Sequence, residues 1–234
     1  MSNRRAYVIA MDGPAGVGKS TIGTMVAKEL GYRFINTGEM YRALTWKALE
    51  EKIDLKDGKA VVKLAKRLQW EFKTVGEGVV IKTHLDGQGV TLQIRAERVS
   101  KNSSIVAGIV GVRTLLRDMQ RALGKNGAIV MEGRDITTNV FPDADFKVYL
   151  DASIEERARR RTKQLRQHGK PANFEKIKEA IILRDMGDLK RKINPLLQAK
   201  DAVVINSTKL SMQETAEMIL KLIRSKKRKQ ISKK

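Results

Sequence analysis

The stretch "GPAGVGKST", residues 13–21, follows directly on the apolar run "YVIAMD", residues 7–12. Its Gly-x4-Gly-Lys-Ser spacing fits a phosphate-binding loop between a strand and a helix. Glycines let backbone N–H groups converge on phosphate oxygens without a clash from Cβ atoms. In such a loop Lys19 reaches the outer phosphates of a triphosphate, and Ser20 is the expected Mg²⁺ ligand. The residues expected to touch the triphosphate are Gly13, Pro14, Ala15, Gly16, Val17, Gly18, Lys19, Ser20 and Thr21.

Apolar runs and helical patterns alternate along the rest of the chain, as in a parallel sheet covered by helices. A segment at 69–95 departs from this pattern, because it has alternating polarity and Gly-rich turns. We therefore predict an α/β fold: a doubly wound, five-stranded parallel core, an inserted domain of helices with a small antiparallel sheet, and a short helical lid. The expected strands are 7–11, 33–36, 128–131, 146–150 and 202–205.

The expected boundaries are core over 1–36, insert over 37–104, core over 105–154, lid over 155–174, core over 175–225 and a disordered basic tail over 226–234. The 234 residues include 47 Lys or Arg and 26 Asp or Glu, a net charge of +21. This excess fits either a binder of nucleic acid or membrane surfaces, or an enzyme with highly anionic substrates. The absence of cysteine excludes disulfides and thiol nucleophiles. No apolar run approaches membrane-spanning length, so we expect a cytoplasmic protein.

Two further stretches follow predicted strands: "NTGEMYRA" at 36–43 and "EGRDI" at 132–136. Open α/β sheets bind their ligands at these carboxyl ends of strands. Arg42 and Arg134 are candidates for a second phosphate, because one guanidinium can donate to two oxygens. Taken alone, Arg42 could equally be a solvated helix residue, and Arg134 could form a structural ion pair with Asp135.

Together these stretches resemble the bacterial cytidylate kinases. The likeness is carried by "DGPAGVGKST", "NTGEMYRA", "EGRDI…VFPDADFKVYLDASIEERARRR" and "RD…D..R…PL..A.DAVVINST", and it runs from about Val8 to Glu217. The resemblance implies ATP-dependent phosphorylation of CMP, with dCMP also accepted. It also implies that the insert is the domain that binds the nucleoside monophosphate, and that a lid around 157–166 closes over ATP.

The resemblance assigns roles to individual residues. The acceptor phosphate would be held by Thr37, Arg42, Arg134 and Arg191, with Tyr41 beside the nucleotide. The cytosine ring would be read by Ser104, Arg113 and Asp135, and the ribose by Arg184 and Asp188. The lid helix carries six basic residues, of which we expect two to be functional and the others to form a solvated face: Arg157, Arg159, Arg160, Arg161, Lys163 and Arg166. Of these we assign Arg157 to ATP and Arg160 to catalysis, together with Lys19, Arg134 and Arg191.

Physical chemistry agrees with the assignment of Asp135. Cytosine presents an amine donor where uracil presents an acceptor oxygen. A fixed carboxylate accepts from the amine and repels the oxygen, which supports discrimination by roughly 10⁴.

The chain departs from the family pattern in three places. Thr137 stands where glycine is common, which would be strained if the backbone there required a positive φ. Gly187 and Leu189 replace an arginine and a small polar residue, and Asn36 replaces an aspartate. One phosphate contact is therefore in doubt.

Two other functions stay open at this point. One is a kinase for another acceptor, such as UMP or a small metabolite like shikimate. The other is a basic nucleic-acid-binding protein with a phosphate-binding loop, in which the tail makes the contact. We expect a monomer that contacts nucleic acid only weakly, through its tail, and does not bind membranes.

Overall fold

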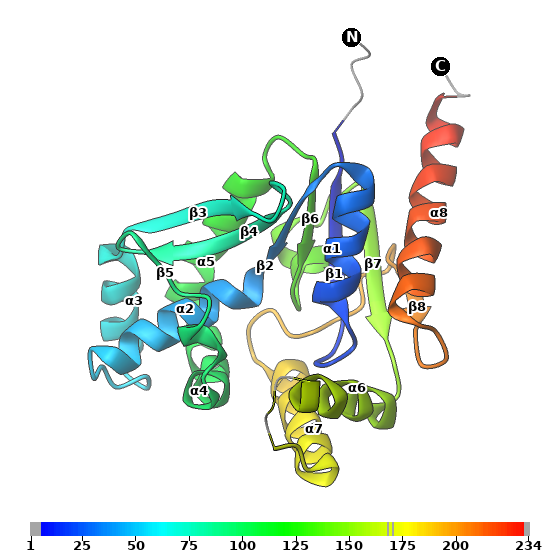
Figure 1. Ribbon diagram of the computed structural model, residues 1–234. Coiled ribbons are helices and arrows are strands. Elements are labelled where there is room, and N and C mark those ends of the chain that lie inside the picture. The colour runs from blue at the N-terminus through cyan, green and yellow to red at the C-terminus, as the bar shows by residue number, and fades with distance from the viewer. Residues whose placement is uncertain (1–5, 168, 170, 232–234) are drawn as a thin grey trace.

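The computed structural model describes residues 6–167, 169 and 171–231. The described strands form one twisted sheet in the order β3-β4-β2-β6-β1-β7-β8, with β5 paired to β4 (Figure 1). Their bounds are β1 Val8–Asp12, β2 Arg33–Asn36, β3 Trp70–Val75, β4 Val80–Leu85, β5 Gln88–Gly89, β6 Ile129–Glu132, β7 Phe146–Asp151 and β8 Val203–Asn206.

Helices connect these strands and cover the sheet. Their bounds are α1 Lys19–Leu30, α2 Thr37–Glu50, α3 Gly58–Arg67, α4 Glu97–Ala107, α5 Val110–Gly124, α6 Ile154–Gln167, α7 Phe174–Lys190 and α8 Met212–Ile231. Two short turns complete the set: the 3₁₀ turn η1 Gln93–Arg95 and the π-helical turn η2 Ile136–Val140. Among the described residues, no helix combines the length and apolar character needed to cross a membrane.

The parallel core matches the prediction. β2, β6, β1, β7 and β8 pair in parallel, and each lies within one residue of an expected strand. The insert adds the antiparallel pair β3 and β4, as the alternating pattern at 69–95 indicated. What the sequence did not reveal is that β4 also pairs in parallel with β2, through Phe34↔Val80 and Ile35↔Ile81. The insert therefore extends the core sheet.

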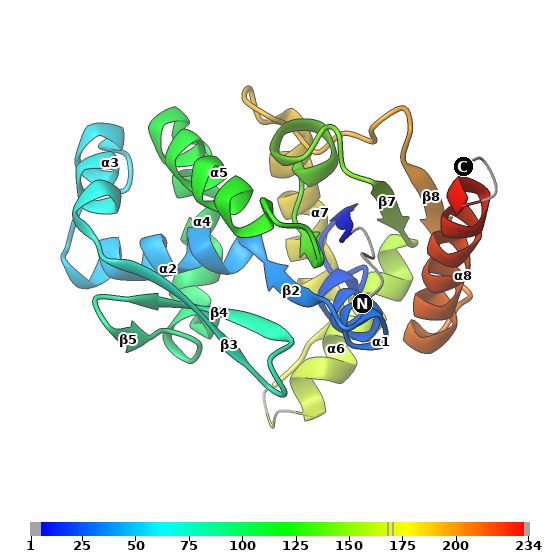
Figure 2. The same ribbon diagram turned by 90° about the horizontal axis from the view of Figure 1, so that it is seen from above.

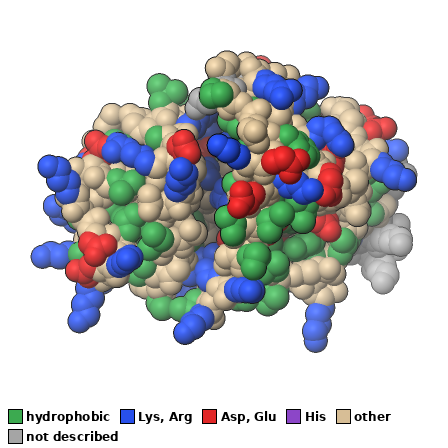
Figure 3. Space-filling model, turned by 90° about the horizontal axis from the view of Figure 1, so that it is seen from below, with side chains coloured by type: hydrophobic (Ala, Val, Ile, Leu, Met, Phe, Trp, Pro, Cys, Tyr) green, Lys and Arg blue, Asp and Glu red, His purple; other side chains and the backbone are tan. Residues whose placement is uncertain are grey.

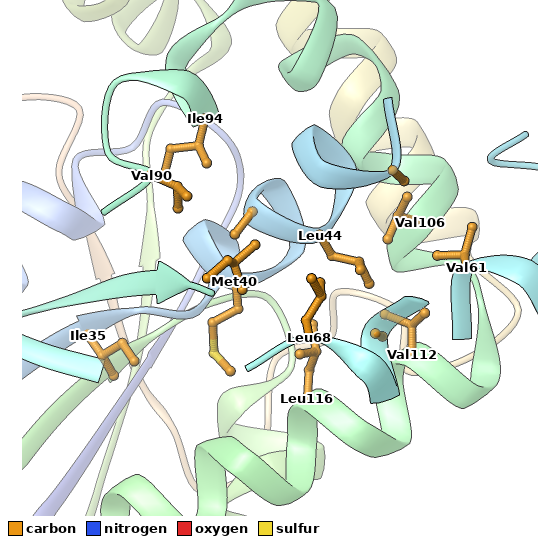
Figure 4. Packing of buried hydrophobic residues seen from close by; sticks show 14 of the residues in the cluster. Ile35, Met40, Leu44, Val61, Leu68, Val90, Ile94, Val106, Val112 and Leu116 are labelled. Atoms are coloured by element: carbon orange, nitrogen blue, oxygen red, sulfur yellow. The ribbon is translucent and has the colours of Figure 1, made fainter. Parts of the chain in front are cut away.

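Two apolar clusters fill the space on the two sides of this sheet. One joins β1, α1, β7 and α8, with Ile9, Ile22, Leu150 and Ile219 among its fully buried members. The other lies under the insert, where α2, α3, α4 and α5 converge (Figure 4). Helix α5, which the sequence placed in the core segment 105–154, thus packs with the insert.

The basic tail differs from the expectation of disorder. Helix α8 runs to Ile231, and only 232–234 lie outside the described residues. Buried Ala216, Ile219 and Ile223 hold its first half against the core. Lys226 then donates to the carbonyl of Asp145 at 2.7 Å and lies 4.9 Å from the centre of the Phe146 ring. These contacts continue the helix into the segment expected to be frayed.

The carboxyl ends of the parallel strands all face one side of the molecule. There α6 and α7 lie side by side below the sheet, and the insert stands opposite them (Figures 1 and 2). Three segments meet between the α6–α7 pair and the insert: the loop after β1 and the stretches that follow β2 and β6. This arrangement brings the predicted donor and acceptor residues to one place.

Candidate active site

The loop between β1 and α1 is shaped by its glycines. Gly13 has φ +148°, and a Cβ atom built there would lie 2.1 Å from the carbonyl oxygen of Leu150. Gly18, at the start of α1, has φ +101°. The close approach to β7 and the left-handed backbone therefore require glycine at these places.

Lys19 is buried within this loop. Its Nζ donates to the carbonyl oxygens of Gly13 and Pro14 at 2.6 and 2.8 Å. Burial, reinforced by the charge of Arg134, lowers the pKa of Lys19 to about 7. A buried ammonium without a bonded carboxylate is a costly group, and a bound phosphate would relieve that cost.

Helices α6 and α7 brace the loop from below. Asp185 of α7 accepts from the backbone N–H of Ala15 at 3.0 Å and forms an ion pair with Arg157 of α6. Arg157 also donates to the carbonyls of Ala15 and Ala152, at 2.9 and 3.0 Å. The expected contact between Arg157 and ATP stays a prediction; in this structure the buried guanidinium bonds the loop backbone and Asp185. Sequence reasoning missed Asp185, whose acidic charge among basic residues was the available signal.

Arg160, assigned to catalysis from the sequence, is occupied in the same way. Its guanidinium donates to Glu156, to the carbonyls of Val17 and Leu210, and to both oxygens of Ser207. It fastens α6 to the loop and to the segment after β8. The structure therefore does not place it as a free catalytic cation.

Arg42, Arg134 and Arg184 lie close enough for their charges to act on one another. Figure 3 shows Lys and Arg side chains gathered in a hollow on the face seen from below. Arg134 donates to Asp188 at 2.7 Å and to the carbonyl of Gly133 at 3.1 Å. Arg42 and Arg184 make no hydrogen bond or ion pair with any described residue.

The environment of this cluster shifts the pKa values of its arginines. Desolvation, followed by the charge of Arg134, lowers the pKa of Arg184 to about 10. Burial also lowers the pKa of Arg42, to which the charges of Arg134 and Arg161 contribute. Arg184 was expected at the ribose, but its charge acts on this cluster and on Lys19. Arg134 is paired with Asp188, but Arg42 and Arg184 have no bonded counter-ion among the described residues, and cationic groups gathered in this way favour a polyanionic ligand. The charge of Arg161, on α6, thus acts on Arg42.

Arg191 and Thr37, also expected at the acceptor phosphate, are turned toward protein. Nε of Arg191 donates to the carbonyls of Ile193 and Asn194 at 2.9 and 3.1 Å. The hydroxyl of Thr37 donates to the carbonyl of Glu132 at 2.8 Å, joining α2 to β6. Thr37 has a single hydroxyl proton and would have to release its carbonyl before it could donate to a phosphate. Arg191 bonds these carbonyls through Nε and Nη2, whereas its Nη1, 3.9 Å from Asp188, could donate without releasing them.

The expected base-reading residues Arg113 and Asp135 form a buried ion pair. Arg113 also donates to the carbonyl of Ala107 at 3.1 Å, and its Nε is buried without a partner among the described residues. Asn139, which sequence reasoning missed, donates to Oδ2 of Asp135 at 2.9 Å. Arg113 binds the same Oδ2, so no described residue donates to Oδ1. A free acceptor therefore lies beside an unpaired donor.

The other two residues assigned to the nucleoside differ in their placement. Tyr41 lies beneath Arg113, whose guanidinium carbon is 5.6 Å from the ring centre, and burial raises the pKa of Tyr41. Ser104 is exposed on α4, and none of the described residues hydrogen-bonds its hydroxyl. The structure thus joins Tyr41 to the ion pair and leaves Ser104 outside it.

A candidate Mg²⁺ position lies at the start of α1. Ser20 Oγ donates to the carboxylate of buried Glu132 and accepts from Nδ2 of Asn36 at 3.1 Å. Hydroxyl and carboxylate oxygens fit Mg²⁺, which keeps several waters and takes further ligands from phosphates. Sequence reasoning missed Glu132. The feature that could have identified it is an acidic residue at the end of β6, the strand that pairs in register with β1.

Two of the departures from the family pattern have a structural explanation. Thr137 does not have a positive φ, so the strain considered for it is absent. Its hydroxyl instead donates to Asp12 at 2.6 Å. At Gly187, in α7, an added Cβ atom would meet nothing within 4 Å, so no described group there is left without the contact that an arginine would make. Nothing in the structure explains Leu189, which is exposed.

Comparisons with known proteins agree with this geometry. The family model described as "Cytidylate kinase" matches residues 9–225. The chain is 44% identical over 220 residues to a cytidylate kinase of Bacillus velezensis, covering 94% of this chain and 97% of that protein. A cytidylate kinase of Bacillus pumilus is 46% identical over 217 residues, which cover 93% of this chain and 96% of the relative.

Among solved structures, an uncharacterized protein from Eubacterium ventriosum matches with a TM-score of 0.52 at 10% identity, covering 94% of this chain and 99% of that one. That likeness concerns the fold alone. The family match over most of the chain and the high identity to its members lead to one conclusion. The chain belongs to the cytidylate kinase family of nucleoside monophosphate kinases.

Proposed function

We propose that this chain transfers the γ-phosphoryl group of ATP to CMP, and to dCMP, giving CDP or dCDP and ADP. The observation that carries the proposal is the Arg113–Asp135 pair beside the arginine cluster. Oδ1 of Asp135 accepts from no described residue and would accept from the exocyclic amine of cytosine, and Nε of Arg113 is a buried donor without a partner among the described residues. Uracil would place an oxygen against the carboxylate, which is the basis for rejecting UMP.

The chemistry requires positioning and charge neutralisation. An oxygen of the acceptor phosphate forms a bond to the γ-phosphorus, and the bond from that phosphorus to the β,γ-bridging oxygen breaks. The acceptor is already anionic, so no side chain need remove a proton. Lys19 neutralises charge on the ATP side, and Arg42, Arg134 and Arg184 do so on the acceptor side. When bound at Ser20 and Glu132, Mg²⁺ supplies further neutralisation of the phosphate oxygens.

Substrate binding would be followed by closure of α6 and α7 toward the insert. Two observations support this step: Arg42 and Arg184 lack partners among the described residues, while Arg191 is occupied by carbonyls of its own loop. Arg157 and Arg160 hold the base of α6 to the core, so closure would involve the outer part around Arg161. Excluding water at that moment favours transfer over hydrolysis.

The test is an ADP-release assay with CMP, dCMP, UMP, AMP and GMP in parallel. CMP and dCMP should exceed the rate without acceptor by orders of magnitude. Asp135→Ala should lower kcat/KM for CMP far more than for UMP, whereas exposed Asp143→Ala, a control, should change neither. Equal losses for CMP and UMP would favour the alternative acceptor. No turnover with any nucleotide would refute the kinase proposal.

The cellular location, the oligomeric state and the partners of the protein are predictions as well. We infer a cytoplasmic monomer whose partners are nucleotides, with nucleic acid bound only weakly through the basic end of α8. Weak binding of this kind should fall steeply as salt rises and should be lost on deletion of 224–234. RNA binding that survived both changes would favour the nucleic-acid function instead.

A further inference from the structure

A hydrogen-bond cluster beneath the base-reading pair joins the two halves of the active site. Asp12, the last residue of β1, is fully buried. Its carboxylate accepts from the backbone N–H of Ile136 at 3.0 Å, from that of Thr137 at 2.7 Å and from the Thr137 hydroxyl at 2.6 Å. Gly13 of the phosphate-binding loop follows Asp12, and Asp135 directly precedes Ile136. One carboxylate thus fastens both loops.

The third of these bonds depends on the residue type at 137. The first N–H groups of a helical turn have no acceptor within it, and Asp12 supplies one for η2 whatever side chains the turn carries. The hydroxyl contact, however, requires serine or threonine. A buried carboxylate is costly unless donors surround it. Burial raises the pKa of Asp12 to about 6, and the hydrogen bonds from Thr137 and Ile136 oppose that rise.

We propose that the Thr137 hydroxyl is a positioning group that sets acceptor specificity. Through Asp12 it holds the first turn of η2 against β1, and so fixes the carboxylate of Asp135 where it meets the acceptor base. The inference rests on the proposed function, because it assumes that Asp135 reads that base. On this inference, the threonine that stands at 137 in place of the common glycine has a role in the reaction.

The effect should be confined to the acceptor side. The phosphate-binding loop has separate supports: Lys19 bonds two of its carbonyls, and Asp185 and Arg157 hold Ala15. The turn that carries Asp135 has fewer ties to β1. Apart from Asp12, the described tie is the bond from the Gly133 N–H to the carbonyl of Met11, at 3.0 Å. Arg113 and Asn139 still hold the Asp135 carboxylate, so loss of the hydroxyl should shift Asp135 relative to β1 rather than release it, and should leave the ATP loop in place.

The experiment compares Thr137→Val, which keeps the shape and removes the hydroxyl, with Thr137→Ser, which keeps it. Thr138→Val is the matched control, because none of the described residues hydrogen-bonds the Thr138 hydroxyl. For each protein, KM for CMP, KM for ATP, kcat, the CMP/UMP ratio of kcat/KM and Tm are measured. CMP binding without ATP is measured by calorimetry.

Thr137→Val should raise KM and Kd for CMP roughly tenfold, the scale of one hydrogen bond to a charged group. KM for ATP should stay within about twofold, and the CMP/UMP ratio should fall by about the same tenfold factor. Thr137→Ser should restore CMP binding to within about threefold, and Thr138→Val should match the wild type. Thr137→Ala carries the same expectation as the valine variant and replaces it if that protein does not fold.

A lowered Tm with unchanged Kd for CMP and an unchanged CMP/UMP ratio would overturn the inference, since the bond would then be purely structural. Equal weakening of CMP and ATP would overturn it as well. Both results differ from failure of the proposed function, in which the wild-type protein would itself bind no CMP.

Discussion

The brace under the phosphate-binding loop can be tested with Arg157→Met. Methionine keeps much of the length of the side chain but loses the bonds to Ala15, Ala152 and Asp185. Both partners of the ion pair are largely buried, with side-chain exposures of 6% and 13%. Removing one partner of such a pair costs about 3 to 5 kcal/mol, because the other charge stays buried and unpaired.

That cost should appear as lower stability before any nucleotide is added. For a chain of this size, each kcal/mol lowers Tm by roughly 2 to 4 °C, so a loss of about 3 kcal/mol lowers it by roughly 6 to 12 °C. Thermal unfolding and urea titration of the free protein measure the change. Arg159→Met is the matched control: it lies on the same helix, is 70% exposed and pairs only with Glu156 among the described residues, so stability should change by less than about 1 kcal/mol.

The kinetics separate a brace from a nucleotide contact. If Arg157 braces the loop, KM for ATP rises together with the fall in stability, and the Asp185→Asn variant shows both effects. If Arg157 instead reached ATP, as the sequence had suggested, Tm of the free protein would stay within about 2 °C of the wild type while KM for ATP rose tenfold or more. That second result would refute the role of Arg157 as a brace.

Three further predictions follow from single features. Gly187→Ala should stabilise the protein by about 0.5 to 1 kcal/mol in urea unfolding, because alanine favours the helix and meets nothing within 4 Å. Glu132→Gln should raise the Mg²⁺ concentration for half-maximal activity several-fold, measured at saturating ATP; an unchanged requirement would remove Glu132 from the metal site. Asp12 should titrate near pH 6 by ¹³C NMR. Its folded pKa exceeds the unfolded value of 3.8, so this carboxyl makes folding about 3 kcal/mol less favourable as pH rises from about 4 to 6, and Thr137→Val should move the midpoint upward.

Much of the fold was readable because its signals are local. The glycines before Lys19 need particular backbone dihedrals, and continuous apolar runs mark strands buried on both faces. The five core strands were therefore placed to within one residue. The pairing of β4 with β2 was not readable, because an edge strand exposes the same backbone groups to any neighbour.

Sequence reasoning named many of the residues that lie at the candidate site, but it missed Asp185, Asn139 and Glu132 and did not predict which partners the named residues have. Arg157 and Arg160 look alike in a run of basic residues, and neither spacing nor charge tells which guanidinium meets a loop carbonyl and which meets a ligand. Likewise, Arg191 was expected on a phosphate and lies on its own loop.

The sequence by itself determined the class of fold, the phosphate-binding loop and many of the residues that lie at the candidate site. Only the tertiary structure decided which of those residues bond other parts of the protein and which have no partner among the described residues. Asp12 and Thr137 lie 125 positions apart, and Arg157 and Asp185 lie 28 apart. Such pairs meet only when separate strands and helices dock, so local patterns carry no record of them. Once those pairs have formed, Oδ1 of Asp135 and the guanidinium groups of Arg42 and Arg184 have no partner among the described residues, and we propose that they are left for substrates.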